Sequence, residues 1–515
     1  MNVPAPQFPA SQRTSYQFPV YKWIGWLAFS GFAIGLLVVY FIAGLFGWPP
    51  PILWASIVIL FTMGALLLDR PKLLLFIMMV YFLAVPSNRL LGIVPIPLLG
   101  SMNKFFMLPF LVVIVMNWIQ RRQIQQGVLF PIAFLLVAIL SWYVNGKPSV
   151  VVTVQLTLIA LRLYILWYYC RLTCTFENDQ EMLRWVWAYI IYIAIQYLYN
   201  IVWHRGLWLR YHPDRSGGIF GPFASGAHLV GYMSVIALLL IVGLWMGRMK
   251  RAGGREKWSL ILLAGIIAYN LIFMTDTKHA LLLMPVAVIP FFFHASFTRW
   301  AKTGAIIGIV VFVLAASIYV QSAMGRRDFQ RVWHSFLRSP KAEMMYALTV
   351  DFPYLVRYPM LGAGPGRFAS TAAIEARAPL ARRYIIPSLD ENRRRGYFLV
   401  TGTVISSSVV GNPVTDFSAI TSEYGWLGAF IFFSFWGWVL YWIMRKAFQA
   451  SGSALRAGIF MALGGCLIFM GMIMVLADIL SVAALVYPIW MLIGRSWDMT
   501  PETVESAELP SLNEA

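Results

Sequence analysis

The stretch Leu361 to Phe368, LGAGPGRF, combines residue types that could bind a phosphate group. Three glycines and a proline within six residues cannot continue a helix, so the segment forms a tight turn, approaches another backbone closely, or both. Backbone N–H groups at Gly364 and Gly366 could approach a phosphate, with the guanidinium of Arg367 beside them. The alternative is a turn that only caps and ends the preceding helix.

Two carboxylates follow near the beginning of a later apolar segment. Asp416 precedes this segment, where the helix dipole and exposed N–H groups keep a carboxylate ionised. It could therefore accept the proton of an attacking hydroxyl group. Because Asp is also a preferred N-cap residue, a capping role is the alternative. Glu423, seven residues later, could orient an acceptor or form an ion pair with Arg367.

Arg162 lies near the middle of the apolar segment VVVTVQLTLIALRLYILWYY, where a charge costs about 2.5 to 3.5 kcal/mol. It needs a partner, which is either a phosphate in a cavity, an internal carboxylate, or backbone carbonyl groups. His279 could serve in acid–base or binding roles, as could His212 and His334, although single histidines in an aromatic-rich interface are more often structural. Their spacing predicts no metal site.

Composition identifies the elements that must position these residues. The 515 residues are 60% hydrophobic and only 12% charged, which predicts an all-α integral membrane protein. Three cysteines give no disulfide framework. Apolar runs long enough to cross a bilayer predict about 12 to 14 transmembrane helices, near residues 23–46, 51–68, 73–86, 105–119, 128–143, 150–169, 182–203, 227–246, 258–274, 279–296, 304–321, 418–444, 457–476 and 480–495.

Lys and Arg residues fall on alternate short connections, which predicts that both termini are cytoplasmic. The first apolar run follows a polar, proline-rich tail without a cleavage site, so it is expected to be a retained span. The predicted organisation is a cytoplasmic tail (1–22), a bundle of about 11 spans with an outward loop at 204–225 (23–321), a long, partly helical periplasmic loop (322–415), C-terminal transmembrane helices (416–496) and an acidic cytoplasmic tail (497–515).

The long outward loop is strongly basic, with 13 basic and six acidic residues from Gln321 to Thr415. This charge predicts an anionic partner, either phosphate or anionic lipid headgroups. We expect an amphipathic helix over 326–338 and a short hairpin around Gly402. Between them, a helix should begin at Ser339-Pro340, end at Tyr358-Pro359, and pack one apolar face onto the transmembrane bundle: Met344, Met345, Leu348, Phe352 and Leu355.

Four stretches together resemble the O-antigen ligase and O-antigen polymerase superfamily. They are DRSGGIFGPFASGAHLVGYM, MTDTKHALLL, DFPYLVRYPMLGAGPGRF and TDFSAITSEYGWLG, and they cover residues 210 to 440. The resemblance implies a bacterial inner-membrane glycosyltransferase that uses neither a metal nor another cofactor. It would transfer glycan from an undecaprenyl-pyrophosphate carrier to an acceptor sugar hydroxyl on the periplasmic face, alongside the lipid bilayer and with a chain-length regulator and a flippase as partners.

The resemblance also assigns roles to individual residues. Arg215 and Lys278 would stabilise the departing pyrophosphate, although both could instead be interfacial residues that extend to lipid headgroups. Asp416 matches the position at which the ligases carry His, which favours a polymerase over a ligase. The remaining candidates for substrate binding are Arg162, Arg357, Gly364, Gly366, Arg367, Glu423 and His279.

Two alternatives to a polysaccharide polymerase stay open. One is a ligase that moves finished glycan onto lipid A core or protein. The other is a lipid-linked oligosaccharide flippase or transporter, which should show charges within its spans and an internal repeat. Apart from Arg162 the spans are nearly uncharged, and no half of the sequence resembles the other. No nucleotide-binding motif is present, and no nucleic-acid partner is expected.

Overall fold

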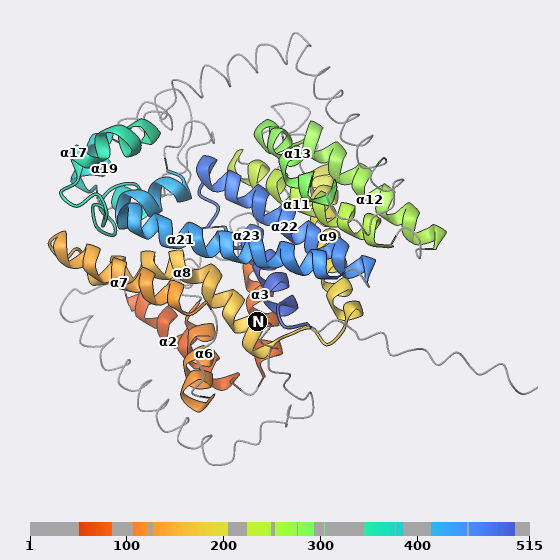
Figure 1. Ribbon diagram of the computed structural model, residues 1–515, viewed down its shortest axis with the longest axis horizontal. Coiled ribbons are helices and arrows are strands. Elements are labelled where there is room, and N and C mark those ends of the chain that lie inside the picture. The colour runs from red at the N-terminus through yellow and green to blue at the C-terminus, as the bar shows by residue number, and fades with distance from the viewer. Residues whose placement is uncertain are drawn as a thin grey trace, which may run out of the picture. The chain divides into compact units, whose positions relative to one another are not determined.

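The computed structural model describes residues 51–68, 70–84, 107–121, 127–203, 224–248, 253–275, 277–292, 303, 344–375, 377–384, 414–450, 453–480 and 482–499. Every regular element within these residues is a helix (Figure 1). The chain divides into two compact units, one comprising 1–78 and 96–121 and the other comprising 79–95 and 122–515. Each unit is described separately below.

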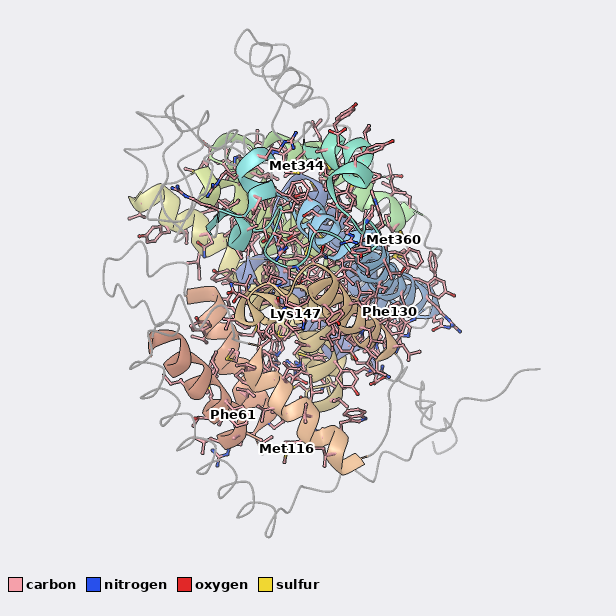
Figure 2. All side chains as sticks on the ribbon, turned by 90° about the vertical axis from the view of Figure 1, so that its left-hand side faces the viewer. Phe61, Met116, Phe130, Lys147, Met344 and Met360 are labelled. Atoms are coloured by element: carbon pink, nitrogen blue, oxygen red, sulfur yellow. The ribbon has the colours of Figure 1, made fainter. Side chains whose placement is uncertain are left out.

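In the first unit, α2 (Pro51–Leu66) packs against α6 (Leu108–Arg121) (Figure 2, where Phe61 and Met116 mark the two helices). The contact needs a glycine, because a Cβ atom at Gly64 would lie 2.7 Å from the Cα atom of Pro109. Helix α3 (Pro71–Ala84) belongs to this unit up to Met78. The helices predicted from the first apolar runs in the described residues are thus confirmed.

The second unit contains the remaining long helices, and the predicted apolar runs within it form helices with ends shifted by a few residues. These helices are α7 (Leu129–Val144), α8 (Val150–Thr173), α9 (Asp179–Trp203), α11 (Ala224–Arg248), α12 (Gly254–Phe273), α13 (Lys278–Phe292), α21 (Asp416–Gln449), α22 (Ala454–Leu476) and α23 (Ala483–Ser496). The last two apolar runs are separate helices, and Asp478 lies in the break between them.

Small residues allow close helix packing in the second unit. Helix α11 runs along α22 (Figure 1), and a Cβ atom at Gly243 would lie 2.8 Å from the Cβ atom of Ala462. At the other end of the contact, a Cβ atom at Gly247 would lie 2.6 Å from the carbonyl oxygen of Ala454. Such glycine-mediated approach is typical of helices that associate in a membrane.

Four described helical segments are long and apolar enough to cross a membrane: α8, residues 228–247 of α11, α21 and α22. Shorter apolar helices occupy 71–83, 108–119, 129–144 and 279–292. The protein therefore has the make-up of an α-helical membrane protein. The predicted total of about 12 to 14 spans, and the orientation of the chain, stay predictions.

Several predicted features lie outside the described residues. These are the spans at 23–46 and 304–321, the amphipathic helix at 326–338, the hairpin around Gly402, the N-terminal tail, the C-terminal tail after residue 499, and Arg215 with most of the outward loop at 204–225.

The described part of the long loop, residues 344–375 and 377–384, has a hydrophobic core of its own. Its first helical stretch covers 344–355, including the π-helical turn η5 (Ala347–Asp351) and α17 (Phe352–Leu355). Two short helices follow, α18 (Thr371–Glu375) and α19 (Pro379–Tyr384). The predicted apolar face is correct, since Met344, Leu348 and Phe352 are buried.

The predicted packing partner of that face needs correction. Met344 and its neighbours pack mainly with loop residues such as Phe368, Ala373 and Ala381, and only Val414 and Trp426 come from the region of α21. The helix also ends at Leu355, three residues before Tyr358. The described part of the loop therefore folds around its own apolar residues.

Candidate functional site

The glycine-rich turn interlocks with α21 where that helix is interrupted. Gly425 has φ 72° and ψ −175°, so the chain leaves the helical path within α21. Gly362 has φ 79°, and a Cβ atom there would lie 2.5 Å from the backbone of Glu423. The N–H group of Trp426 donates to the carbonyl of Pro359 at 3.2 Å. Two backbones cross here at a distance that only glycine permits.

The next two glycines of the turn pack against the α7–α8 connection. A Cβ atom at Gly364 would lie 2.9 Å from the Cβ atom of Asn145, and one at Gly366 would lie 2.5 Å from Cγ1 of Val152. The N–H group of Gly364 donates to the carbonyl of Glu423 at 3.2 Å, and that of Gly366 donates to Glu423 Oε2 at 2.7 Å. Both N–H groups thus donate to Glu423, and their approach to a phosphate stays a prediction.

Glu423 is 1% exposed. Its Oε2 atom accepts the Gly366 N–H group at 2.7 Å, whereas its Oε1 atom has no hydrogen-bond partner within the described residues. The loop backbone therefore binds one oxygen of this buried carboxyl group. Within the described residues no ion pair joins Glu423 to Arg367, so the loop backbone replaces the partner that the sequence suggested.

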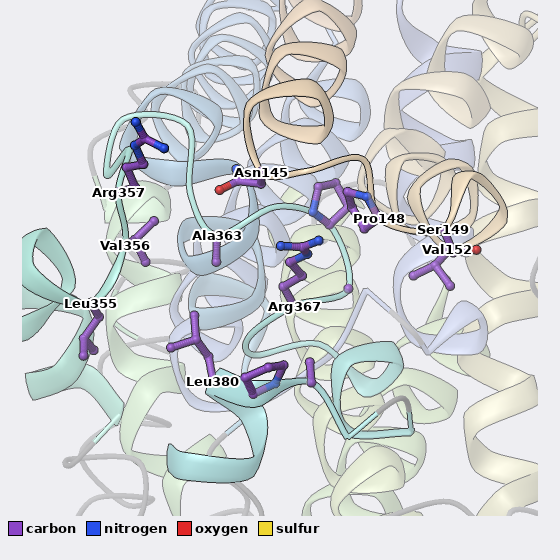
Figure 3. A pocket seen from close by; sticks show the side chains of 14 residues that line it. Asn145, Pro148, Ser149, Val152, Leu355, Val356, Arg357, Ala363, Arg367 and Leu380 are labelled. Atoms are coloured by element: carbon purple, nitrogen blue, oxygen red, sulfur yellow. The ribbon is translucent and has the colours of Figure 1, made fainter.

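A cavity of about 500 Å³ opens beside this interlock (Figure 3). Its walls come from 145–152 in the α7–α8 connection and from 355–367 and 378–380 in the loop. Among the described lining residues, Arg357 and Arg367 carry a charge, and none is a carboxylate. The Arg357 guanidinium lies 5.4 Å from the ring centre of Tyr358. Within the part of the chain that the structure describes, no hydrogen bond or ion pair engages the Arg367 side chain.

Side-chain hydrogen bonds from Trp142 and Asn145 stabilise the α7–α8 connection. Asn145 Nδ2 donates to the carbonyls of Ser141 at 2.8 Å and Gly362 at 3.0 Å, and Trp142 Nε1 donates to the carbonyl of Pro148 at 2.7 Å. Ser141 Oγ also donates to the carbonyl of Glu423 at 3.0 Å. Sequence reasoning missed Asn145. Its only signal is an Asn-Gly pair directly after an apolar helix, which predicts a turn and does not reveal its partner in the loop.

Asp416 and Arg162 meet at the break between α22 and α23. The Asp416 carboxylate is 3% exposed and accepts N–H groups from Ile479 at 2.8 Å and from Leu480 at 3.1 Å. Asp478 also hydrogen-bonds to it. From α8, Arg162 Nη1 donates to the carbonyl of Leu480 at 2.7 Å. Of the partners considered for Arg162, a backbone carbonyl is thus observed among the described residues.

The capping alternative for Asp416 is also resolved. The N-cap of α21 is Thr415, whose hydroxyl accepts the N–H group of Ser418 at 3.0 Å, while Ser418 Oγ accepts the N–H group of Thr415 at 2.8 Å. Asp416 is the first residue of α21. Its carboxylate instead accepts the backbone N–H groups at the break between α22 and α23. Unpaired peptide groups in a membrane helix break are costly, so Asp416 and Arg162 both have a structural role here.

His279 belongs to a separate cluster at the beginning of α13. Its Nε2 atom lies 2.6 Å from the hydroxyl of Tyr232, and its ring centre lies 5.5 Å from that of His228. Lys278 is the first residue of α13. Among the described residues, no group of three or more His, Cys, Asp and Glu side chains could hold a metal ion.

The structure thus brings together only part of the predicted site. Arg357, Gly366 and Arg367 line the cavity, and Glu423 holds the wall behind them. Gly364, Arg162, Asp416 and His279 are not among the lining residues. Neither a scan of this chain against protein-family models nor a search of curated proteins found a match.

Proposed function

We propose that this protein is a membrane glycosyltransferase that extends a polysaccharide by moving glycan units from a polyprenyl-pyrophosphate carrier to an acceptor hydroxyl. The observation that carries the proposal is a cavity whose described lining residues include two arginines and no carboxylate. Such a cavity favours an anionic ligand, and Arg can hold two oxygens of a phosphate at once. The four stretches that resemble O-antigen ligases and polymerases supply the reaction class.

The chemistry needs positive charge near the leaving group. The bond between the sugar carbon and the pyrophosphate oxygen breaks, the acceptor oxygen bonds to that carbon, and the acceptor proton passes to a base. Negative charge grows on the pyrophosphate as the bond breaks, so fixed cations stabilise the transition state more than the ground state. In this proposal Arg357 and Arg367 supply that charge, together with Arg215 and Lys278 if these approach the same ligand.

The cavity residues that the structure describes include neither a carboxylate nor an imidazole that could accept the proton. Asp416 stays the proposed base, although its oxygens already accept two backbone N–H groups. To act as a base, it would have to become accessible to the acceptor hydroxyl. Location on the periplasmic face of a bacterial inner membrane belongs to the same proposal.

The test is reconstitution of the purified protein in phosphatidylcholine nanodiscs with lipid-pyrophosphate-linked repeat units and no nucleotide. A ladder of longer lipid-linked chains on a gel is expected of a polymerase, whereas transfer of whole glycan to a lipid A core acceptor would indicate a ligase. Arg367→Gln should slow extension at least about tenfold. Arg382→Gln is the matched control, because Arg382 is an exposed loop arginine outside the cavity lining. Full extension by an Arg357→Gln, Arg367→Gln double variant would refute the proposal.

A further inference from the structure

The side chain of Asn145 lines the arginine-lined cavity. Its NH₂ group has two hydrogens, and both are donated to carbonyls, those of Ser141 at 2.8 Å and Gly362 at 3.0 Å. These two bonds fix which end of the amide is oxygen, because an amide oxygen carries no hydrogen and cannot donate to a carbonyl. They also fix the direction of the side chain, which projects from the end of α7 between Arg357 and Arg367 in Figure 3.

The amide oxygen of Asn145 has no donor within the described residues. An amide oxygen accepts up to two hydrogen bonds and cannot donate. A bare phosphate offers oxygens that mostly accept, so it suits the arginines and does not suit this atom. A ligand that satisfies all three side chains must carry an anionic group and, close to it, a hydroxyl donor.

We propose that Asn145 recognises a hydroxyl group of a phosphate ester whose charge is bound by Arg357 and Arg367. The inference rests on the proposed function for the anionic part of the ligand and adds the substrate class, which is a hydroxyl-bearing phosphate ester such as a sugar phosphate. The same chemistry is present in the headgroup of phosphatidylglycerol. Asn145 is then a specificity-determining residue, because a ligand without the hydroxyl leaves a desolvated acceptor unpaired.

The experiment compares two probes of similar shape, glucose 1-phosphate and cyclohexyl phosphate, by calorimetric titration of the full-length protein in phosphatidylcholine nanodiscs. The wild type should bind glucose 1-phosphate about two- to tenfold more tightly, as expected for one hydrogen bond. Equal binding of the two probes by the wild type would overturn the inference, and that result needs no variant.

Asn145→Leu tests the residue itself, because Leu has a similar size and no acceptor. Any loss of the bond to Gly362 weakens both probes alike, so the ratio of the two dissociation constants isolates the amide oxygen. This ratio should fall to about one in Asn145→Leu, whereas Arg367→Gln should weaken both probes and keep the ratio. An unchanged ratio in Asn145→Leu would overturn the assignment.

Two further results separate this inference from the proposed function. Discrimination between the probes without chain extension would uphold the role of Asn145 and refute the glycosyltransferase. Chain extension without discrimination between the probes would support the glycosyltransferase and refute the role of Asn145. Repeating the titration in phosphatidylglycerol nanodiscs identifies the source of the ligand: if the lipid abolishes binding of glucose 1-phosphate, the natural occupant is a lipid headgroup, and if binding persists, it is a sugar phosphate.

Discussion

At the scale of single residues, Glu423 joins the loop to the transmembrane helix. Its carboxylate accepts the Gly366 N–H group at 2.7 Å, and its carbonyl accepts Ser141 Oγ at 3.0 Å. Glu423→Gln keeps the size of the side chain but replaces one carboxyl oxygen with an NH₂ group, which cannot accept a hydrogen bond, so we expect a loss of about 0.5 to 1.5 kcal/mol in stability. Thermal unfolding in nanodiscs measures it, and limited proteolysis should cut the variant first in the loop. A melting curve identical to the wild type would show that the second carboxyl oxygen is not needed.

Arg162 is a second residue whose role can be separated by mutation. Because it donates to the carbonyl of Leu480 at 2.7 Å and does not line the arginine cavity, Arg162→Met should lower stability by about 1 to 3 kcal/mol. The folded fraction should bind cyclohexyl phosphate as the wild type does. Loss of this binding from a fully folded variant would restore the prediction that Arg162 reaches a phosphate.

At the scale of elements, the crossing of the glycine turn and α21 depends on Gly425. Gly425→Ala places a methyl group against the backbone of Met360 at a positive φ of 72°. We expect a loss of at least about 1 to 3 kcal/mol, with failure to fold as the extreme. Gly437→Ala in the same helix is the matched control, since a Cβ atom there meets nothing within 4 Å. It should leave stability unchanged or raise it by about 0.5 to 1 kcal/mol. Equal unfolding temperatures for the two variants would contradict this account.

The sequence predicted the elements better than their contacts. Apolar runs located the helices to within a few residues, because membrane-length hydrophobicity is a local property. The helical spacing of the apolar residues likewise predicted the buried face at Met344, Leu348 and Phe352. By contrast, Asn145 and Gly362 are separated by 217 residues, and no local pattern pairs them. The glycines looked like a phosphate loop because backbone crossing and anion binding need the same residue type.

At the scale of the whole molecule, the distribution of basic residues predicts the orientation of the chain. Lys147 and Arg255 are both exposed, and the rule for basic loops places them on opposite sides of the membrane. Cys substituted at 147 should react with a membrane-impermeant maleimide on intact spheroplasts, whereas Cys at 255 should react only after lysis. The native Cys170, Cys174 and Cys466 are buried and should not react with the maleimide. The opposite labelling pattern would place the arginine cavity in the cytosol and remove the proposed function.

The interlock between the loop and α21 also governs biogenesis. Residues 344–384 are synthesised before Asp416–Gln449, yet the Gly366 N–H group donates to a carboxylate from the later segment. A nascent chain that stops before residue 416 therefore lacks the acceptor of this N–H group. The hydrogen bond between the loop and α21 can form only after α21 has been synthesised.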